Sequence, residues 1–143
     1  MIKNILNLGD TAVYCDFGVE VNETINASVI LYFHHISELI KDKKIEGITN
    51  LTPSYNKLII SFDLTITNYK KIKNFVEGLN IGKNIKNNNQ KVKIPVCCDD
   101  EYGLDFSRLV EKLNIDKNKI LELYLDKEYF CYMTGFIAGM PFL

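Results

Sequence analysis

The sequence of 143 residues has no tryptophan, only three prolines and no long apolar run. Its first ten residues, MIKNILNLGD, lack the apolar core of a signal peptide, and no stretch reaches the roughly 20 apolar residues that span a bilayer. Neither sign of charge prevails, because 17 basic residues face 18 acidic ones. Bulk charge therefore predicts no affinity for nucleic acid or for an anionic membrane. Together these absences predict a cytoplasmic globular protein.

Metal-ligand patterns are also missing. The four cysteines follow no zinc spacing and form no Cys-x-x-Cys pair; they are Cys15, Cys97, Cys98 and Cys131. Each lies in a stretch with strand character, which favours burial as a small apolar group. His34 and His35 are neighbours on a predicted helix, so their side chains diverge by about 100° and cannot easily share a metal. The sequence predicts no metal site.

The first two-thirds of the chain predicts alternating strands and helices. Residues 11–18 alternate with period two, as in a strand, and Asn22 can cap a helix with an apolar stripe up to Ile40. Residues 46–63 predict a hairpin with strands at 48–52 and 57–62. Thr67 can cap a second helix, and residues 92–97, VKIPVC, return to strand character. This β-α-β-β-α-β order predicts an α+β fold, a ferredoxin-like split βαβ domain over residues 1–91.

The pattern changes after residue 97. Asp105 and Asp116 can each cap a short helix, and residues 128–133 predict a strand. The chain then continues as TGFIAGMPFL, residues 134–143. We interpret residues 92–143 as the opening part of a second domain. Its apolar end needs cover from the first domain, from a second copy of the chain in a homodimer, or from a partner chain.

Chemical motifs are weak in this sequence. Gly135-x-x-x-Gly139 is neither a Walker loop nor G-x-G-x-x-G, and close backbone packing is favoured over a phosphate cradle. An acidic cluster surrounds the turn before the third helix: Asp99, Asp100, Glu101 and Asp105. A solvated turn with a helix N-cap is favoured there over a Mg²⁺ or acid–base site. No catalytic residue is assigned.

Two groups of motifs together resemble one family. The first is LGDTAVYCDFG at 8–18 with GITNLTPSYNKLIISFD at 47–63. The second is IPVC at 94–97, YGLDF at 102–106 and EYFCYMTGFIAGMPFL at 128–143. In this order they resemble the KipI/PxpB family, also called allophanate hydrolase subunit 1 or the carboxyltransferase C/D domain. The closing block is the most specific part, because the family pattern there is G-F-x-P-G-F-x-Y-L.

The resemblance implies a ferredoxin-like domain followed by the start of a cyclophilin-like β-barrel near Ile94, completed by later strands in relatives. The chain is then expected to be either a truncated form or one whose barrel is completed by a separate chain. It also implies a subunit of an ATP-dependent 5-oxoprolinase, which opens 5-oxoproline to glutamate with companion subunits and with ATP and Mg²⁺ in the complex. The alternative is a regulatory module that inhibits a sensor histidine kinase. The fold alone does not choose between them.

The family pattern also assigns candidate site residues. Those expected near a ligand or partner cleft are Gly103, Asp105, Tyr129, Gly135, Phe136 and Gly139. Three positions depart from the pattern, since Ala138 replaces a proline, Met140 a phenylalanine and Tyr124 a common histidine. Loss of that histidine removes a group able to transfer protons near neutral pH. Catalysis by this chain alone is therefore not expected.

Overall fold

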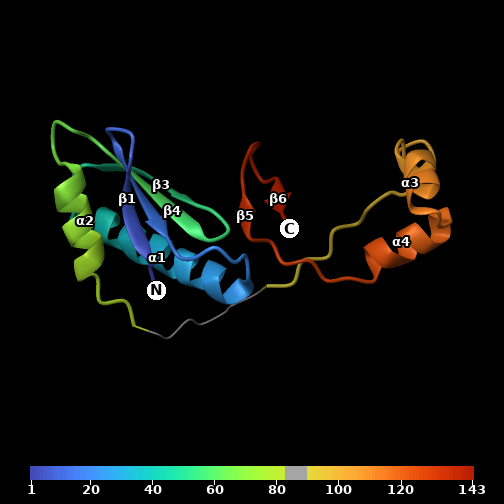
Figure 1. The fold of residues 1–143 in the computed structure, drawn as a ribbon, viewed down its shortest axis with the longest axis horizontal. Helices are drawn as coiled ribbons and strands as arrows, with labels where there is room; N and C mark the ends of the chain where they lie inside the picture. Colours follow the sequence, from blue (N-terminus) through green and yellow to red (C-terminus); the bar gives the residue numbers. More distant parts are fainter. Residues whose placement is uncertain (83–89) are drawn as a thin grey trace. The chain divides into compact units, whose positions relative to one another are not determined.

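The computed structural model describes residues 1–82 and 90–143, and these form a mixed α/β structure with an antiparallel sheet and four helices. The chain divides into two compact units, Met1–Asn87 with Cys131–Leu143, and Asn88–Phe130. The elements labelled in Figure 1 are β1 Asn4–Leu8, β2 Ala12–Asp16, α1 Glu23–Lys41, β3 Ile48–Pro53, β4 Lys57–Phe62, α2 Tyr69–Gly78, α3 Phe106–Leu113, α4 Lys117–Leu125, β5 Met133–Thr134 and β6 Pro141–Phe142.

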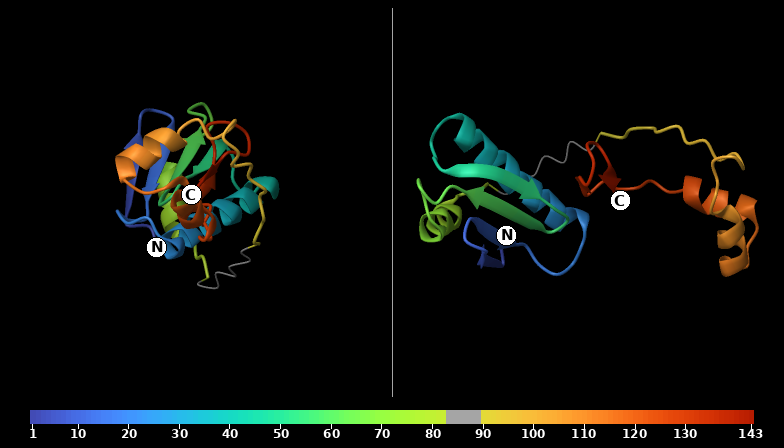
Figure 2. Two further views of the ribbon diagram at one scale, coloured as in Figure 1. Left: turned by 90° about the vertical axis from the view of Figure 1, so that its right-hand side faces the viewer. Right: turned by 90° about the horizontal axis from the view of Figure 1, so that it is seen from above.

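The first unit is built on a four-stranded antiparallel sheet with the order β1-β2-β4-β3. Side chains alternate between the two faces of a strand, and Val13 of β2 lies opposite Ile60 of β4 on the buried face. Both are fully buried, together with Ile36 of α1 and Ile72 of α2. One core therefore joins both helices to one face of the sheet, as the sequence predicts; Figure 2 shows this unit from two further sides.

The strand beside β2 differs from the prediction. Residues 92–97 form no strand, and Val92, Ile94 and Val96 are exposed. The position beside β2 belongs instead to β1, which sequence analysis missed and whose Asn4 lies opposite Asp16. Only residues 9–11 separate the two strands, so this pairing closes a short loop at low entropic cost. The observed order is β-β-α-β-β-α, and the predicted last strand is wrong.

The starts of the first two helices follow capping chemistry. The Asn22 side chain accepts a hydrogen bond from the Ile25 backbone N–H at 2.9 Å, which confirms the predicted cap of α1. The cap of α2 is Asn68, whose side chain accepts from the Lys71 N–H at 3.0 Å, and the prediction of Thr67 is wrong. Thr67 is buried in the preceding turn, where its N–H donates to the Asp63 carbonyl.

The second unit contains the two shorter helices. Asp116 caps α4 by accepting from the Lys119 N–H at 3.0 Å, as predicted. Asp105 occupies the N-cap position of α3 but makes no side-chain cap, because its backbone is already in the helical region. Its carboxylate instead pairs with Arg108 at 3.1 Å. Helices α3 and α4 have no fully buried residue.

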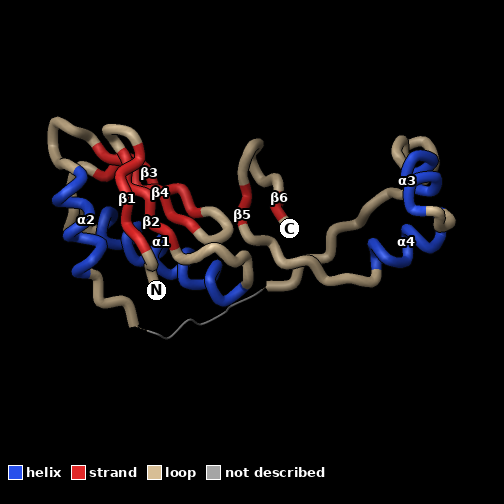
Figure 3. The backbone as a smooth tube through the Cα atoms, in the orientation of Figure 1, coloured by secondary structure: helices blue, strands red, loops and turns tan. Residues whose placement is uncertain are grey.

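The cysteines are placed differently from the prediction. Cys15 lies in β2 and is fully buried, and burial raises the pKa of its thiol to about 12. Cys97, Cys98 and Cys131 lie outside strands, and Cys97 and Cys131 are exposed. Figure 3 shows the segment that leads to α3 as loop, which is why adjacent Cys97 and Cys98 have no sheet to be buried in.

Residues 131–143 form a short hairpin, which we call the closing hairpin. Strand β5 pairs with β6, and the predicted strand over 128–133 is reduced to Met133 and Thr134. The Tyr132 N–H donates to the Phe142 carbonyl at 2.9 Å, and the Gly135 N–H to the Met140 carbonyl at 3.1 Å. Across the described ranges, 1–82 and 90–143, the structure has no helix of the length and apolar character that crossing a membrane requires.

Candidate functional site

The most constrained polar side chain beside the closing hairpin is that of Asn26 in the second turn of α1. Only 3% of Asn26 is exposed. Its Nδ2 lies 3.3 Å from the Ser54 carbonyl oxygen and 3.0 Å from that of Tyr55, both in the β3–β4 turn. The same nitrogen lies 3.0 Å from the Tyr132 carbonyl oxygen in the closing hairpin. One amide group therefore joins α1, the turn and the hairpin.

Aromatic contacts surround this junction. The Tyr55 ring lies 5.6 Å from the Tyr132 ring and 6.5 Å from the Phe142 ring, which it meets edge-on at 86°. The Ser54 hydroxyl lies 3.5 Å from the Met133 sulfur. The closing hairpin thus packs on residues 1–82 through the Asn26 side-chain hydrogen bond, the Ser54–Met133 contact and ring contacts. Three kinds of cover were predicted for the apolar end. The structure shows one of them, folding back on the first domain, for Tyr132, Met133 and Phe142.

The far end of the closing hairpin remains exposed. The loop between β5 and β6 is closed by the Ile137 N–H, which donates to the Gly135 carbonyl at 2.8 Å. Gly139 has a φ of +81°, a region that favours glycine over side-chain-bearing residues. Phe136 also has a positive φ, +64°, and is 92% exposed. Three predicted site residues, Gly135, Phe136 and Gly139, therefore share one protruding loop.

The other predicted site residues lie in the second unit. Gly103 precedes α3, and a Cβ at this position would overlap a ring carbon of Phe106, so only glycine fits without a shift. The Asp105 carboxylate forms an ion pair with Arg108. Tyr129 donates its hydroxyl to the Tyr124 carbonyl at 3.0 Å. The structure brings Gly103 and Asp105 together at the start of α3, with Tyr129 after α4.

The acidic turn is held by ordinary structural contacts. The Asp99 carbonyl accepts from the Tyr102 and Gly103 N–H groups at 3.0 Å each. Asp100 pairs with Lys117, whose hydrogen bond and charge lower the pKa of the Asp100 carboxyl. Within residues 1–82 and 90–143, no three His, Cys, Asp or Glu side chains are grouped as a metal site would need. Hydrogen bonds and an ion pair within the second unit thus hold this turn, but the predicted side-chain cap by Asp105 is wrong.

A second buried polar cluster fixes the loop after β2. Lys57 donates to Asp16 Oδ1 at 2.5 Å and also to the Gly18 carbonyl, and the Gly18 N–H donates to Asp16 Oδ1 at 2.8 Å. These bonds hold the pKa of Asp16 below its usual value, with the Lys57 hydrogen bond as the largest cause. Asn56 donates to the Gly18 and Glu20 carbonyls at 2.9 and 3.0 Å. The cluster is internally paired and serves the fold.

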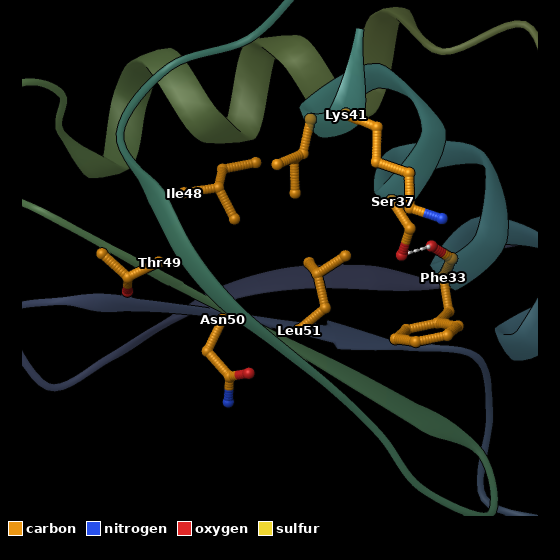
Figure 4. A pocket seen from close by; sticks show the side chains of 8 residues that line it. Phe33, Ser37, Lys41, Ile48, Thr49, Asn50 and Leu51 are labelled. Atoms are coloured by element: carbon orange, nitrogen blue, oxygen red, sulfur yellow. Dashed lines mark hydrogen bonds between the residues drawn. The ribbon is translucent and has the colours of Figure 1, made fainter. Parts of the chain in front are cut away.

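A shallow groove separates α1 from the edge strand β3. In Figure 4 Phe33, Ser37 and Lys41 of α1 face the residues of β3, and the Ser37 hydroxyl is bonded to the Phe33 carbonyl at 2.7 Å. The groove is lined by Phe33, Ser37, Ile40, Lys41, Ile48, Thr49, Asn50 and Leu51. Lys41 is the one ionisable side chain in that lining, so these residues offer no acid–base pair for catalysis.

Sequence reasoning missed Asn26, Ser54 and Tyr55 as parts of the junction. The segment T-P-S-Y-N, residues 52–56, reads as a turn and as part of the family pattern, and nothing more. Asn26 has one detectable signal, since asparagine is a poor residue for the buried face of a helix unless its amide has partners. The identity of those partners depends on contacts between distant segments.

Comparisons with known proteins agree with the family resemblance. The family model described as "Carboxyltransferase domain, subdomain C and D" matches residues 3–143. The B subunit of the 5-oxoprolinase of Bacillus subtilis (strain 168) is 26% identical over 155 residues, which cover 97% of this chain and 61% of the relative. The chain thus spans about three-fifths of that relative's length.

One solved structure, that of TTHA0988, shows the same kind of fold. The crystal structure of TTHA0988 is similar with a TM-score of 0.70 and 22% identity, over 92% of this chain and 25% of that one. The N-terminal domain of the histidine kinase inhibitor KipI from Bacillus subtilis is 26% identical, over 52% of this chain and 79% of that one, with a TM-score of 0.37.

Proposed function

This chain belongs to the family of the carboxyltransferase domain, subdomain C and D, and from that membership we propose that it is one component of an ATP-dependent amide hydrolase of the 5-oxoprolinase kind. The observation that carries the proposal is the similarity to the B subunit of 5-oxoprolinase along 97% of the chain. The proposed reaction is hydrolysis of the internal amide of 5-oxoproline to give glutamate. Because that relative is by name one subunit of an enzyme, we assign the activity to a complex with companion subunits.

The role proposed for this chain is to supply a surface, with no catalytic residue of its own. The loop that carries Gly135, Phe136 and Gly139 protrudes from the closing hairpin, and its aromatic side chain is exposed. We propose that this loop, with Gly103, Asp105 and Tyr129, lines the ligand or partner cleft of the complex. An exposed aromatic ring suits contact with a small amide or with another protein of the complex.

We propose that the acidic turn of this chain does not hold Mg²⁺–ATP. Magnesium bound to nucleotide phosphates is usually held by one or two free carboxylates. In the acidic turn, however, Asp100 is paired with Lys117 and Asp105 with Arg108. We therefore assign ATP and Mg²⁺ to the companion subunits, and no step of this chain's role is derived through them.

The finer fold assignment is part of the same proposal. We propose that residues 1–91 correspond to a ferredoxin-like domain in which β1 occupies the edge beside β2. We further propose that residues 92–143 correspond to the opening part of a cyclophilin-like domain. The family match over residues 3–143 supports both assignments.

The proposal is tested by reconstitution. Companion subunits from the same organism are purified and assayed for ATP-dependent glutamate release from 5-oxoproline, with this chain, without it, and with a heat-denatured sample as control. The expected result is release only when the folded chain is present. Equal rates in all three mixtures contradict the proposal.

The same preparation separates the competing role. A regulatory module would lower autophosphorylation of a sensor histidine kinase and would leave 5-oxoproline hydrolysis unaffected. Assays of both activities with one batch of protein therefore distinguish the two functions.

A further inference from the structure

We propose that Asn26 is the positioning residue that holds the closing hairpin on the β3–β4 turn and so sets where the exposed Gly135–Gly139 loop stands. The inference goes beyond the proposed function and does not depend on it. It concerns how the first domain controls the placement of this loop. It is tested by amide exchange of this chain alone, without companion subunits.

The contacts of Asn26 define which of its atoms acts. Three carbonyl oxygens, from Ser54, Tyr55 and Tyr132, lie within 3.3 Å of one side-chain nitrogen. An amide oxygen placed there would face three acceptors and gain no bond, so the amide nitrogen must point this way. Its two hydrogens serve three acceptors, and one is therefore shared.

Burial makes this arrangement costly to break. Asn26 is 3% exposed, so water cannot readily replace a lost donor. Removing the donor from a partly buried carbonyl destabilises the contact that the hydrogen bond makes. The Tyr132 carbonyl belongs to the closing hairpin, while the other two belong to the turn. Loss of the Asn26 donor therefore weakens the contact between the β3–β4 turn and the closing hairpin.

We expect the exposed Gly135–Gly139 loop to move when the contact between Asn26 and Tyr132 is lost. Phe136 holds a φ of +64° although it is not glycine, and such a backbone conformation is strained. The loop is closed at its base by the Gly135 N–H on the Met140 carbonyl and the Tyr132 N–H on the Phe142 carbonyl. Tyr132 is thus shared between the Asn26 contact and the base of the hairpin.

The decisive experiment is backbone amide exchange measured by NMR on the full chain and on Asn26→Asp. This substitution keeps the shape of the side chain and replaces the donor with an acceptor. The expected result is exchange at least roughly tenfold faster at Tyr132 and Gly135, with β2 and β4 amides unchanged. Asn56→Asp is the matched control. Asn56 is also buried and its amide also bonds two carbonyls, but these belong to Gly18 and Glu20.

Two results overturn the inference. One is unchanged exchange at Tyr132 and Gly135 in Asn26→Asp; the other is equal acceleration of hairpin and sheet amides, which would mean a general loss of stability. If Asn26→Asp does not fold, Tyr55→Ala takes its place, because it removes the ring that contacts Tyr132 and Phe142 and leaves α1 intact. Unchanged hairpin exchange in Tyr55→Ala then overturns the proposed contact between the turn and the hairpin.

Discussion

The rings of Tyr55 and Tyr132 lie 5.6 Å apart, with their planes inclined by 40°. Tyr55 belongs to the turn between β3 and β4, whereas Tyr132 directly precedes β5. Ring pairs at this distance contribute about 0.5–1.5 kcal/mol beyond the area they bury. The Tyr55 ring of the turn therefore supports the closing hairpin, which is far away in the sequence.

This support predicts energetic coupling between the turn and the last strand. In a double-mutant cycle of Tyr55→Ala and Phe142→Ala, we expect a coupling free energy of about 0.5–1.5 kcal/mol in urea unfolding, because the two rings meet edge-on. Tyr55→Ala combined with Val76→Ala is the control, since α2 lies at the other end of the sheet (Figure 1). Additive effects in both pairs would show that the ring contact adds nothing.

The Asp16–Lys57 pair predicts a change of stability with pH. A carboxyl whose pKa is lowered on folding adds stability above its unfolded pKa of about 3.9, and this stability is lost as the pH falls through the lower folded value. We expect the free energy of unfolding to fall less steeply below about pH 4 in Asp16→Asn than in the unchanged chain. Urea unfolding across this range measures it.

The companion variant is Lys57→Met, which removes the hydrogen bond that is the largest cause of the lowered pKa of Asp16. This variant should show a shallower acid slope, as Asp16→Asn does. If Asp16→Asn keeps the slope of the unchanged chain, the Lys57 contact does not stabilise the folded state.

Thiol accessibility gives a third prediction. The thiolate is the reactive form of cysteine, and burial raises the pKa of Cys15 to about 12. We expect iodoacetamide at neutral pH to modify exposed Cys97 and Cys131 in the folded chain, and Cys15 only in urea. Mass spectrometry of peptides locates the labels. Labelling of Cys15 in the folded chain at the rate of Cys131 would contradict its placement in the core.

A fourth prediction concerns Gly103. An added Cβ would overlap the Phe106 ring, whose centroid lies 4.8 Å from the Lys117 ammonium. We expect Gly103→Ala to displace the ring and to speed amide exchange at the start of α3 by several-fold. Gly82→Ala is the control, because a Cβ there meets no atom within 4 Å. Equal exchange in both variants would remove the proposed close contact.

Periodicity predicted the elements whose apolar residues share one face. Helix α1 repeats apolar residues at steps of three and four, and β4 alternates buried and half-buried residues, so both were predictable. Strand β1 was missed because most of its residues are exposed and its pattern is weak. Residues 92–97 were predicted as the last strand instead, because composition alone does not show which of two apolar segments pairs with a sheet.

The candidate site was predictable only in part. The glycine positions of the closing loop followed from the family pattern, and a need for cover followed from its apolar residues. The residues that provide the cover, Asn26 and Tyr55, could not be predicted. Nothing in the pattern of a capped helix or of a polar turn indicates a contact with a distant segment. Their role depends on a contact with Tyr132 that local patterns do not encode.

The central claim is that the first domain holds the closing hairpin so that its loop meets companion subunits. The most direct test is amide exchange of the full chain, alone and in the presence of those subunits. We predict slower exchange at residues 134–140 in the mixture, with β2 and β4 amides unchanged. Identical exchange of residues 134–140 in a mixture that has formed a complex, as shown by sedimentation, would contradict the account.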